Sequence, residues 1–214
     1  MKITTASVTI EEDDLDGHRL IRKIEAAGRT CYKSEGKATE GTAGTFIGRI
    51  ISSGHESVIE HEKVTARFIC DRGVSHELVR HRIASFSQES TRYCNYANDR
   101  FGNEITVIEP CYWKDNNEMK ERWRHAMENA ERHYFELIEH GAKPEEARSV
   151  LPNSLKTEIV VTMNLREWRH FFKLRTAKNA HPQMREIAVQ ALIMFKKAIP
   201  IIFDDIPVPE YPAQ

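Results

Sequence analysis

Strand-type and helix-type segments follow one another in an irregular order along this chain. Residues 62–70 alternate polar and apolar side chains, which is typical of a half-buried strand, and residues 155–163 form a second strand-type segment. Residues 116–140 instead place apolar side chains along one stripe of a long helix. Because no regular strand–helix–strand repeat joins these segments, the order predicts an α+β fold rather than a parallel α/β sheet.

Shorter segments fit the same fold class. Further strands are predicted at residues 2–10 and 104–109, an irregular polar stretch at 83–100, and an irregular proline-rich tail at about 204–214. The predicted helices cover residues 16–27, 41–53, 74–80, 144–150, 165–175 and 182–198. One compact domain of this length buries about 70% of the surface that its unfolded chain exposes. We therefore expect residues 1–214 to form a single domain.

Charge and hydropathy argue against several classes of protein. The chain carries 31 basic and 32 acidic residues, for a net charge of -1. A general nucleic-acid binder would carry a basic surplus on one face. No apolar run reaches the roughly 18 residues that a membrane span needs, and the N-terminal residues MKITTASVTIEEDD lack the apolar core of a signal peptide.

The four cysteines are expected to be free thiols. They are Cys31, Cys70, Cys94 and Cys111, and no two of them form a CxxC pair. A chain of this size does not need disulfides for stability. Together with the missing signal peptide, this predicts a cytoplasmic protein.

Residues 80–93, RHRIASFSQESTRY, are the most unusual part of the sequence. The segment combines four cationic or imidazole groups with serine hydroxyls and a glutamine. Buried without partners, such groups would cost about 1–3 kcal/mol each. Exposed, the clustered cations would repel one another. Arginine forms forked, charge-assisted hydrogen bonds with phosphate oxygens, so we predict an anion site; a solvated loop is the alternative.

The same segment carries a family resemblance. Arg80, His81 and Arg82, followed after seven residues by Ser90, match the RHR-x7-S motif of the flavin-dependent thymidylate synthases. Further matching blocks are RHRIAS at 80–85, STRY at 90–93, GHESVIEH at 54–61, EARSVLP at 146–152, NLREWRHFFKLR at 164–175 and AHPQ at 180–183. The blocks are collinear from about Ala27 to Ile199, so the resemblance covers nearly the whole chain.

The resemblance implies a fold, a reaction and an assembly. The family has a mixed, largely antiparallel sheet flanked by helices in a single catalytic domain. It methylates dUMP reductively to dTMP, with FAD as cofactor, NADPH as reductant and methylenetetrahydrofolate as one-carbon donor. It also implies a homotetramer with active sites shared between subunits. Neither nucleic acid nor membrane is expected as a partner, and no metal is expected.

The resemblance also assigns site residues position by position. The cofactor-binding residues would be Ser57, Arg80, His81, Arg82, Gln88, Asn164, Arg166 and His170. The nucleotide would contact Glu77, Arg80, Gln88, Glu89, Ser90, Thr91, Arg92, Arg148 and Arg175. His55, Glu60 and His181 fall near the cofactor region without an assigned role. Glu77 stands where glutamine is common in the family, and Cys31 where a small hydroxyl residue is frequent.

The chemistry assigned by resemblance centres on Arg175. C5 of uracil is a poor nucleophile and needs electronic activation. A guanidinium at the uracil edge would stabilise negative charge that develops at N3 and O4. The rival route adds a cysteine thiolate to C6, and Cys94, close to the arginine segment, is its candidate. We expect Cys94 to be inert, because it has no obvious activating neighbourhood. Ser90 lacks a recognisable base, so we expect a hydrogen-bond donor rather than a nucleophile.

Two alternatives of other classes stay open at the sequence level. HExxxEH at 55–61 resembles a metal site, but its histidines are six residues apart, whereas a zinc HExxH helix has them four apart. A non-enzymatic phosphate or nucleic-acid binding module could also use the arginine segment, although its footprint would be a basic surface with interleaved aromatics.

His125, His133 and His140 are expected on the exposed side of the long helix.

Overall fold

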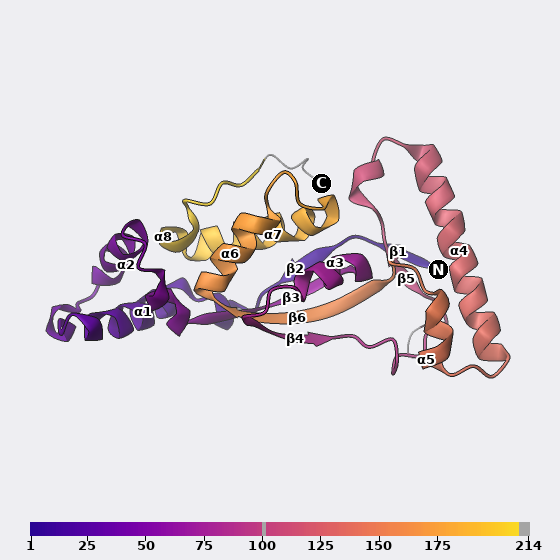
Figure 1. The fold of residues 1–214 in the computed structure, drawn as a ribbon, viewed down its shortest axis with the longest axis horizontal. Helices are drawn as coiled ribbons and strands as arrows, with labels where there is room; N and C mark the ends of the chain where they lie inside the picture. Colours follow the sequence, from indigo (N-terminus) through magenta and orange to yellow (C-terminus); the bar gives the residue numbers. More distant parts are fainter. Residues whose placement is uncertain (100–101, 210–214) are drawn as a thin grey trace. The chain divides into compact units, whose positions relative to one another are not determined.

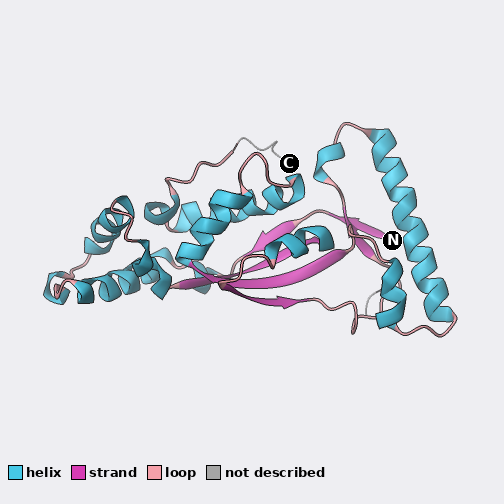
Figure 2. Cartoon of the chain, in the orientation of Figure 1, coloured by secondary structure: helices cyan, strands magenta, loops and turns pink. Residues whose placement is uncertain are grey.

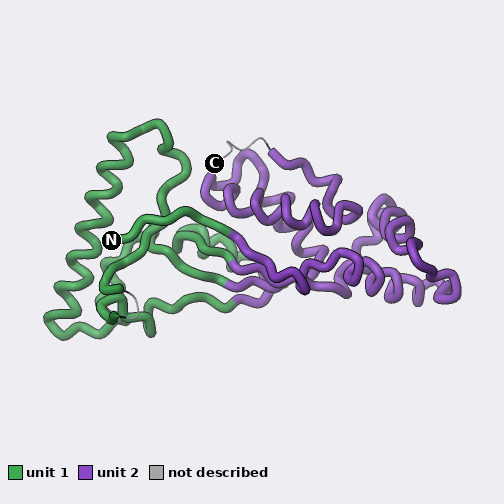
Figure 3. Tube along the Cα trace, turned by 180° about the vertical axis from the view of Figure 1, so that it is seen from behind, with its two compact units in different colours: residues 1–7, 68–80, 87–159 green, residues 8–67, 81–86, 160–214 purple. Residues whose placement is uncertain are grey.

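The computed structural model describes residues 1–99 and 102–209. Helices and strands follow one another without a regular repeat (Figure 2), which confirms the predicted α+β class. The chain divides into two compact units (Figure 3). Unit 1 comprises residues 1–7, 68–80 and 87–159, and unit 2 comprises residues 8–67, 81–86 and 160–214. The single-domain organisation stays a prediction.

A four-stranded sheet has the order β2-β3-β6-β4 (Figure 1). Its strands are β2 (Ser7–Thr9), β3 (Lys63–Asp71), β4 (Ala84–Gln88) and β6 (Lys156–Asn164). At one end of the β3–β6 pair the amide of Leu165 donates to the carbonyl of Glu62, and at the other end the amide of Arg72 donates to that of Leu155. The residue numbers run in opposite directions along this pair, so it is antiparallel. This confirms the expected antiparallel pairing.

Unit 1 contains a second, parallel strand pair and the long helix. The pair joins β1 (Lys2–Thr4) to β5 (Thr106–Ile108). The helices of this unit are α3 (Arg72–Leu78), α4 (Asn117–Glu139) and α5 (Pro144–Ala147), with short 3₁₀ segments η5 (Cys111–Trp113) and η6 (Arg148–Val150). The side chain of Asn116 caps α4 by accepting from the amide of Met119. One face of α4 buries Trp123, Met127 and Tyr134 in the core of this unit.

Unit 2 is mainly helical. Its elements besides strand residues are η1 (Glu12–Leu15), α1 (Gly17–Cys31), η2 (Glu35–Lys37), α2 (Thr42–Ser52), η3 (Glu56–His61), α6 (Leu165–Arg175), α7 (Pro182–Ala198) and α8 (Pro200–Phe203). An aromatic cluster from α6, α7 and α8 forms its core, in which Trp168 stacks on Phe172 and tilts against Phe195. Trp168 also donates its indole N–H to the carbonyl of Val64 over 3.0 Å, which fixes α6 on β3.

Two sequence expectations were wrong in part. Residues 2–10 form two strands rather than one, because β1 pairs with β5 whereas β2 pairs with β3 in another sheet. The stretch 83–100 is not irregular throughout, since residues 84–88 form strand β4. Its sequence, ASFSQ, alternates Ala84 and Phe86 with exposed serines, but it is short and mostly polar, so this alternation is a weak signal. The strand forms through pairing with β6 at the edge of the sheet.

The other elements follow the sequence within a few residues. The expected helix 144–150 divides into α5 and η6, and helix α1 continues to Cys31. Residues 204–209 are irregular as expected, whereas 210–214 lie outside the described residues. Among residues 1–99 and 102–209, no helix has both the length and the apolar character of a membrane span.

Candidate active site

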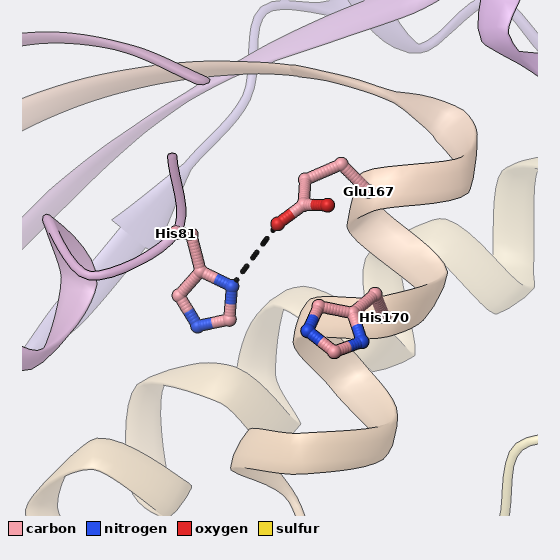
Figure 4. A group of neighbouring side chains, drawn as sticks. All are labelled: His81, Glu167 and His170. Atoms are coloured by element: carbon pink, nitrogen blue, oxygen red, sulfur yellow. Dashed lines mark hydrogen bonds and ion pairs between the residues drawn. The ribbon is translucent and has the colours of Figure 1, made fainter. Parts of the chain in front are cut away.

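The imidazole of His81 is buried among four side chains of helix α6 in unit 2. Only 4% of His81 is exposed. Figure 4 shows its Nδ1 facing Oε1 of Glu167, 3.2 Å away, with His170 beside it. On the other side of the ring, Nε of Arg175 donates to Nε2 of His81 over 3.1 Å. The edge of the Phe171 ring packs against the imidazole, with centroids 5.1 Å apart.

These contacts define the protonation of His81. Nε2 accepts a hydrogen bond from a guanidinium, so it carries no proton, and the ring proton must be on Nδ1, where it is donated to Glu167. Burial lowers the pKa of His81 and outweighs the hydrogen bond to Glu167, which raises it; the charge of Arg175 lowers it further. The imidazole is therefore neutral at neutral pH.

Helix α6 supplies the partners of His81 from one stretch of sequence. The Asn164 side chain caps the helix by accepting from the amide of Glu167 over 2.8 Å. This cap orients the first turn, and His170 follows Glu167 by three residues on the same side of the helix. His81, Glu167 and His170 have the mutual spacing of metal ligands. Both nitrogens of His81 already have partners, one of them a cation, so the group is a hydrogen-bonded cluster.

A cavity of 580 Å³ opens beside this cluster within unit 2. Its walls include Glu60, Ile83, Asn164, Arg166, His170 and Lys173. Three of the residues assigned to the cofactor by resemblance therefore line one cavity. Arg166 is held there by an ion pair with Glu60, with 2.5 Å between Nη1 and Oε1. Ser57 is exposed on η3, the element that also carries Glu60.

The two arginines that flank His81 in the sequence are available for a ligand. Arg80 and Arg82 are both exposed. Within the ranges 1–99 and 102–209, neither guanidinium has a hydrogen-bond or ion-pair partner. Two unpaired cations so close in sequence repel one another, and an anionic group relieves that repulsion. The donor set therefore fits the phosphates of a dinucleotide such as FAD.

The residues assigned to the nucleotide gather in unit 1, except Arg175. Thr91 is buried and accepts from Nη1 of Arg148 over 3.4 Å. Arg92 donates its Nε–H to Glu145 over 2.8 Å, and the Ser90 hydroxyl accepts from the Arg92 amide. Two exposed guanidiniums and two hydroxyls thus lie on the segment after β4 and on η6, a donor set suited to a monophosphate.

Gln88 and Glu89 are held by the sheet. The amide group of Gln88 donates to the hydroxyls of Ser75 and Thr157, at 2.8 and 3.2 Å. The two carboxylate oxygens of Glu89 accept from the hydroxyl of Tyr96 and from Nζ of Lys156, at 3.1 and 3.0 Å. Burial, followed by the charge of Glu89, raises the pKa of Tyr96, so this phenol stays protonated. Glu77 lies half-buried on α3.

Comparison with known proteins decides the family. The family model described as "Thymidylate synthase complementing protein" matches residues 18–201. A flavin-dependent thymidylate synthase of Geobacter sulfurreducens is 38% identical over 189 residues, which span 85% of this chain and 80% of that protein. The one of Corynebacterium glutamicum is 32% identical over 210 residues, spanning 90% of this chain and 81% of that protein. The chain belongs to the flavin-dependent thymidylate synthases.

A solved structure shows the same fold. It is described as the crystal structure of a UMP/dUMP methylase PolB from Streptomyces cacaoi bound with 5-Br dUMP. The TM-score is 0.77 at 24% sequence identity, and the match covers 95% of this chain and 96% of that one. This chain therefore shares the fold of that protein over nearly its whole length.

Sequence reasoning missed three residues of the site in this flavin-dependent thymidylate synthase. Glu167 has a recognisable signal, since it lies three residues after a capping asparagine and three before His170. Lys156 and Glu145 have none. Lys156 reaches Glu89 only through strand pairing, because the amide of Glu89 donates to the carbonyl of Glu158. Glu145 reaches Arg92 across 53 residues of chain.

In the structure, the acidic residues of the HExxxEH segment and the alternative nucleophile Cys94 have other contacts. Glu56 and Glu60 of the HExxxEH segment are paired with Arg169 and Arg166, at 2.9 and 2.5 Å, so their carboxylates already have cationic partners. Cys94 is half-buried and packs against the core of unit 1, and its amide donates to the carbonyl of Ser90. The Cys94 thiol thus has the surroundings of a core residue.

Proposed function

We propose that this enzyme converts dUMP to dTMP, with methylenetetrahydrofolate as one-carbon donor and NADPH as reductant of its FAD. Membership of the family supports the reaction and the flavin. The fold it shares with a methylase of UMP and dUMP supports a uridine nucleotide as acceptor. The observation that carries the proposal in this chain is the neutral His81, which holds the guanidinium of Arg175 by its Nε–H.

The cofactor would be held by the basic groups of the RHR segment and by the cavity on α6. Among the described residues, the guanidiniums of Arg80 and Arg82 have no partner and could bind the phosphates, and Asn164, Arg166 and His170 line the cavity. Ser57, Gln88 and the backbone of His81 complete the proposed cofactor set. When bound, FAD supplies the hydride for the reduction. The residues of this chain contribute binding, orientation and charge.

The nucleotide would be held by the donors of unit 1. Arg92 and Arg148 would bind the 5′-phosphate, and the hydroxyls of Ser90 and Thr91 would fill its remaining lone pairs. Arg80 would assist them. Gln88, Glu89 and Glu77 would complete the contacts. Gln88 is hydrogen-bonded to Ser75 of α3, and Glu89 to Lys156 of β6, so their remaining polar atoms are preorganised for a ligand.

Arg175 is the proposed catalytic residue. Methylation at C5 requires electron density that the pyrimidine ring itself supplies as negative charge develops at N3 and O4. A guanidinium at that edge stabilises the developing negative charge and needs no covalent bond to the protein. The bond from Arg175 to His81 fixes the position of this charge. A thiolate mechanism through Cys94 is the second candidate, and its half-buried position against the core does not favour it.

The assembly is part of the proposal. We propose one catalytic domain per chain and a homotetramer in which subunits share active sites, as the family resemblance implies. All four cysteines are free thiols, which supports a cytoplasmic location. Nucleic acid is not a proposed partner, because the charge is balanced at -1. A membrane is not a proposed partner either.

The purified protein tests this proposal directly. We expect a yellow protein with a flavin absorbance band. Addition of dUMP, methylenetetrahydrofolate and NADPH should yield dTMP, detectable by chromatography, and omission of any one of them should abolish the product. A colourless protein that forms no dTMP and retards DNA in a gel would instead identify a non-enzymatic nucleic-acid binder.

A further inference from the structure

Glu167 contacts no group that the proposed reaction assigns to a substrate, yet it lies at the end of a chain of hydrogen bonds that reaches Arg175. Its Oε1 is 3.2 Å from Nδ1 of His81, and Nε2 of the same ring is 3.1 Å from Nε of Arg175. We propose that Glu167 is a positioning residue, which fixes the tautomer of His81 and thereby the guanidinium of Arg175. This inference rests on the proposed catalytic role of Arg175.

The tautomer is the physical link between the two contacts. A neutral imidazole carries one proton, on either nitrogen. Arg175 is a donor only, so its Nε–H requires an unprotonated Nε2. Glu167, ionised, is an acceptor only, so it requires the proton on Nδ1. The two partners select the same tautomer. Removal of the acceptor at Nδ1 leaves this selection to Arg175 alone, so the Nε2–H form, which repels the N–H of Arg175, becomes more populated.

The burial of His81 and Glu167 strengthens the preference for the Nδ1–H tautomer. The side chain of His81 is 3% exposed and that of Glu167 is 11% exposed. Few waters can therefore replace either partner, and hydrogen bonds in such surroundings are stronger than in water. The Phe171 ring packs edge-on against the imidazole and restricts its rotation. Glu167 and Arg175 are eight residues apart on α6, slightly more than two turns, so both face the side of the helix on which His81 packs.

The arrangement also has a pH dependence of known sign. Within residues 1–99 and 102–209, the titratable or charged groups that act on the pKa of His81 are Glu167, His170 and Arg175, all on α6. Protonation of His81 places a proton on Nε2 and breaks the contact with Arg175. The bond from Glu167 raises the pKa of His81, whereas burial lowers it more. Loss of the carboxylate charge should therefore move the protonation of His81 to lower pH.

Two substitutions separate the hydrogen bond from the charge. Glu167→Gln retains a carbonyl oxygen that can accept from Nδ1–H, and Glu167→Ala retains no acceptor. Glu136→Ala is the matched control, because Glu136 forms the same contact with Nδ1 of His133 at 2.9 Å, but on the exposed surface of α4. Long-range ¹H–¹⁵N spectra of histidine-labelled holoenzyme report which ring nitrogen is protonated, and a His81→Gln spectrum assigns the His81 signals.

The expected results differ between the variants. In wild type and Glu167→Gln, His81 should be protonated on Nδ1, and kcat should agree within about threefold. In Glu167→Gln the pH at which His81 gains its second proton should be lower. In Glu167→Ala the Nε2–H tautomer should appear and kcat should fall about tenfold or more, with the KM for dUMP little changed. The loss should stay below the roughly 10²–10³-fold typical of deleting a donor outright. Glu136→Ala should match wild type in kcat.

The outcomes distinguish this inference from the proposed function. Glu167→Ala with the wild-type tautomer, or with full activity despite a changed tautomer, overturns the positioning role. Should Glu167→Ala fail to fold, judged by its circular dichroism, Glu167→Gln decides: an unchanged protonation of His81 across the pH range overturns the inference. An inactive wild-type enzyme whose His81 spectrum is as expected contradicts the proposed function and leaves the hydrogen-bond chain intact.

Discussion

Arg92 is a phosphate ligand of the proposed site whose guanidinium already has an anionic partner. Its Nε–H bonds to Glu145 at 2.8 Å, and both side chains are largely exposed, at 58% and 40%. Exposed ion pairs contribute only about 0.2–1 kcal/mol. A bound phosphate therefore competes with the carboxylate of Glu145, which binds Arg92 only weakly. Glu145 thus lowers the affinity for the phosphate and contributes little to the stability of the site.

Substitution Glu145→Gln should release Arg92 from this competition. We expect the KM for dUMP to fall by up to about fivefold, the equivalent of at most about 1 kcal/mol, with kcat unchanged. Steady-state kinetics at low ionic strength measure the effect, because salt screens such exposed charges. Glu118→Gln is the control, since Glu118 forms an equally short and more exposed pair with Arg122 on α4. A raised KM in Glu145→Gln would show that Glu145 supports nucleotide binding.

At the scale of elements, Arg169 joins three segments of unit 2. Its side chain is 2% exposed, starts on α6, and reaches Glu56 of η3 at 2.9 Å. It also donates to both carboxylate oxygens of Asp205, at 2.6 and 2.7 Å, and to the carbonyl of Ile202. A buried guanidinium with several acceptors fixes the C-terminal segment on α6. This is the helix that carries Glu167 and Arg175.

Asp205→Asn should therefore destabilise the protein in a pH-dependent way. The hydrogen bond from Arg169 lowers the pKa of Asp205 below its ordinary value. The carboxylate thus stabilises the fold above the unfolded-state pKa of about 4, and this contribution is lost as pH falls through the lower folded-state pKa. Because Asp205 is half exposed, we expect about 1 kcal/mol at pH 7, or a Tm lowered by about 2–4 °C.

Differential scanning fluorimetry between pH 3 and 7 measures this difference in Tm. The difference in Tm between wild type and Asp205→Asn should become smaller as the pH approaches 3. Asp204→Asn is the control, because Asp204 is a neighbouring exposed carboxylate without a side-chain partner among residues 1–99 and 102–209. An Asp205→Asn variant as stable as Asp204→Asn at pH 7 would show that the Arg169 contacts do not stabilise this segment.

Elements with a strong hydrophobic period were predictable, and those formed by pairing were not. Strands β3 and β6 alternate buried residues with half-buried or exposed ones, and the stripe on α4 buries Trp123, Met127 and Tyr134. Strand β4 has this alternation over a short, mostly polar segment only, and it forms through pairing with β6. The same limit applies to the site. Matching motifs indicated Arg175 and His81, but the contacts of His81 with Glu167 and Arg175 bridge 86 and 94 residues, and only the packing of α6 reveals them.

At the scale of the whole molecule, the assigned residues are distributed over distant parts of the chain. The cavity residues Asn164, Arg166 and His170 belong to unit 2, whereas Thr91, Arg92 and Arg148 belong to unit 1. The proposed tetramer allows a single active site to take these two sets from different chains. Shared sites have a consequence for mixed assemblies, because two defective chains can together build an intact site.

Co-expression of two inactive variants tests this consequence. Arg166→Ala should weaken the cofactor set and Arg148→Ala the nucleotide set, and each alone should have low activity. If the sets of one site come from different subunits, mixed assemblies contain some sites with both sets intact, and dTMP formation should recover to a measurable fraction of wild type. Chains that carry both substitutions, co-expressed with themselves, are the control. Mixed assemblies as inactive as this control would indicate that each chain builds its own site.

The central claim is that the charge of Arg175, rather than a covalent bond to the protein, activates dUMP. The most direct measurement compares dTMP formation by Arg175→Ala and Cys94→Ala at saturating dUMP, with flavin content matched by absorbance. Loss of one electrostatic donor raises a barrier by about 2.7–4 kcal/mol. We predict a kcat about 10²–10³-fold below wild type for Arg175→Ala and near-wild-type turnover for Cys94→Ala. An inactive Cys94→Ala beside an active Arg175→Ala would contradict the account.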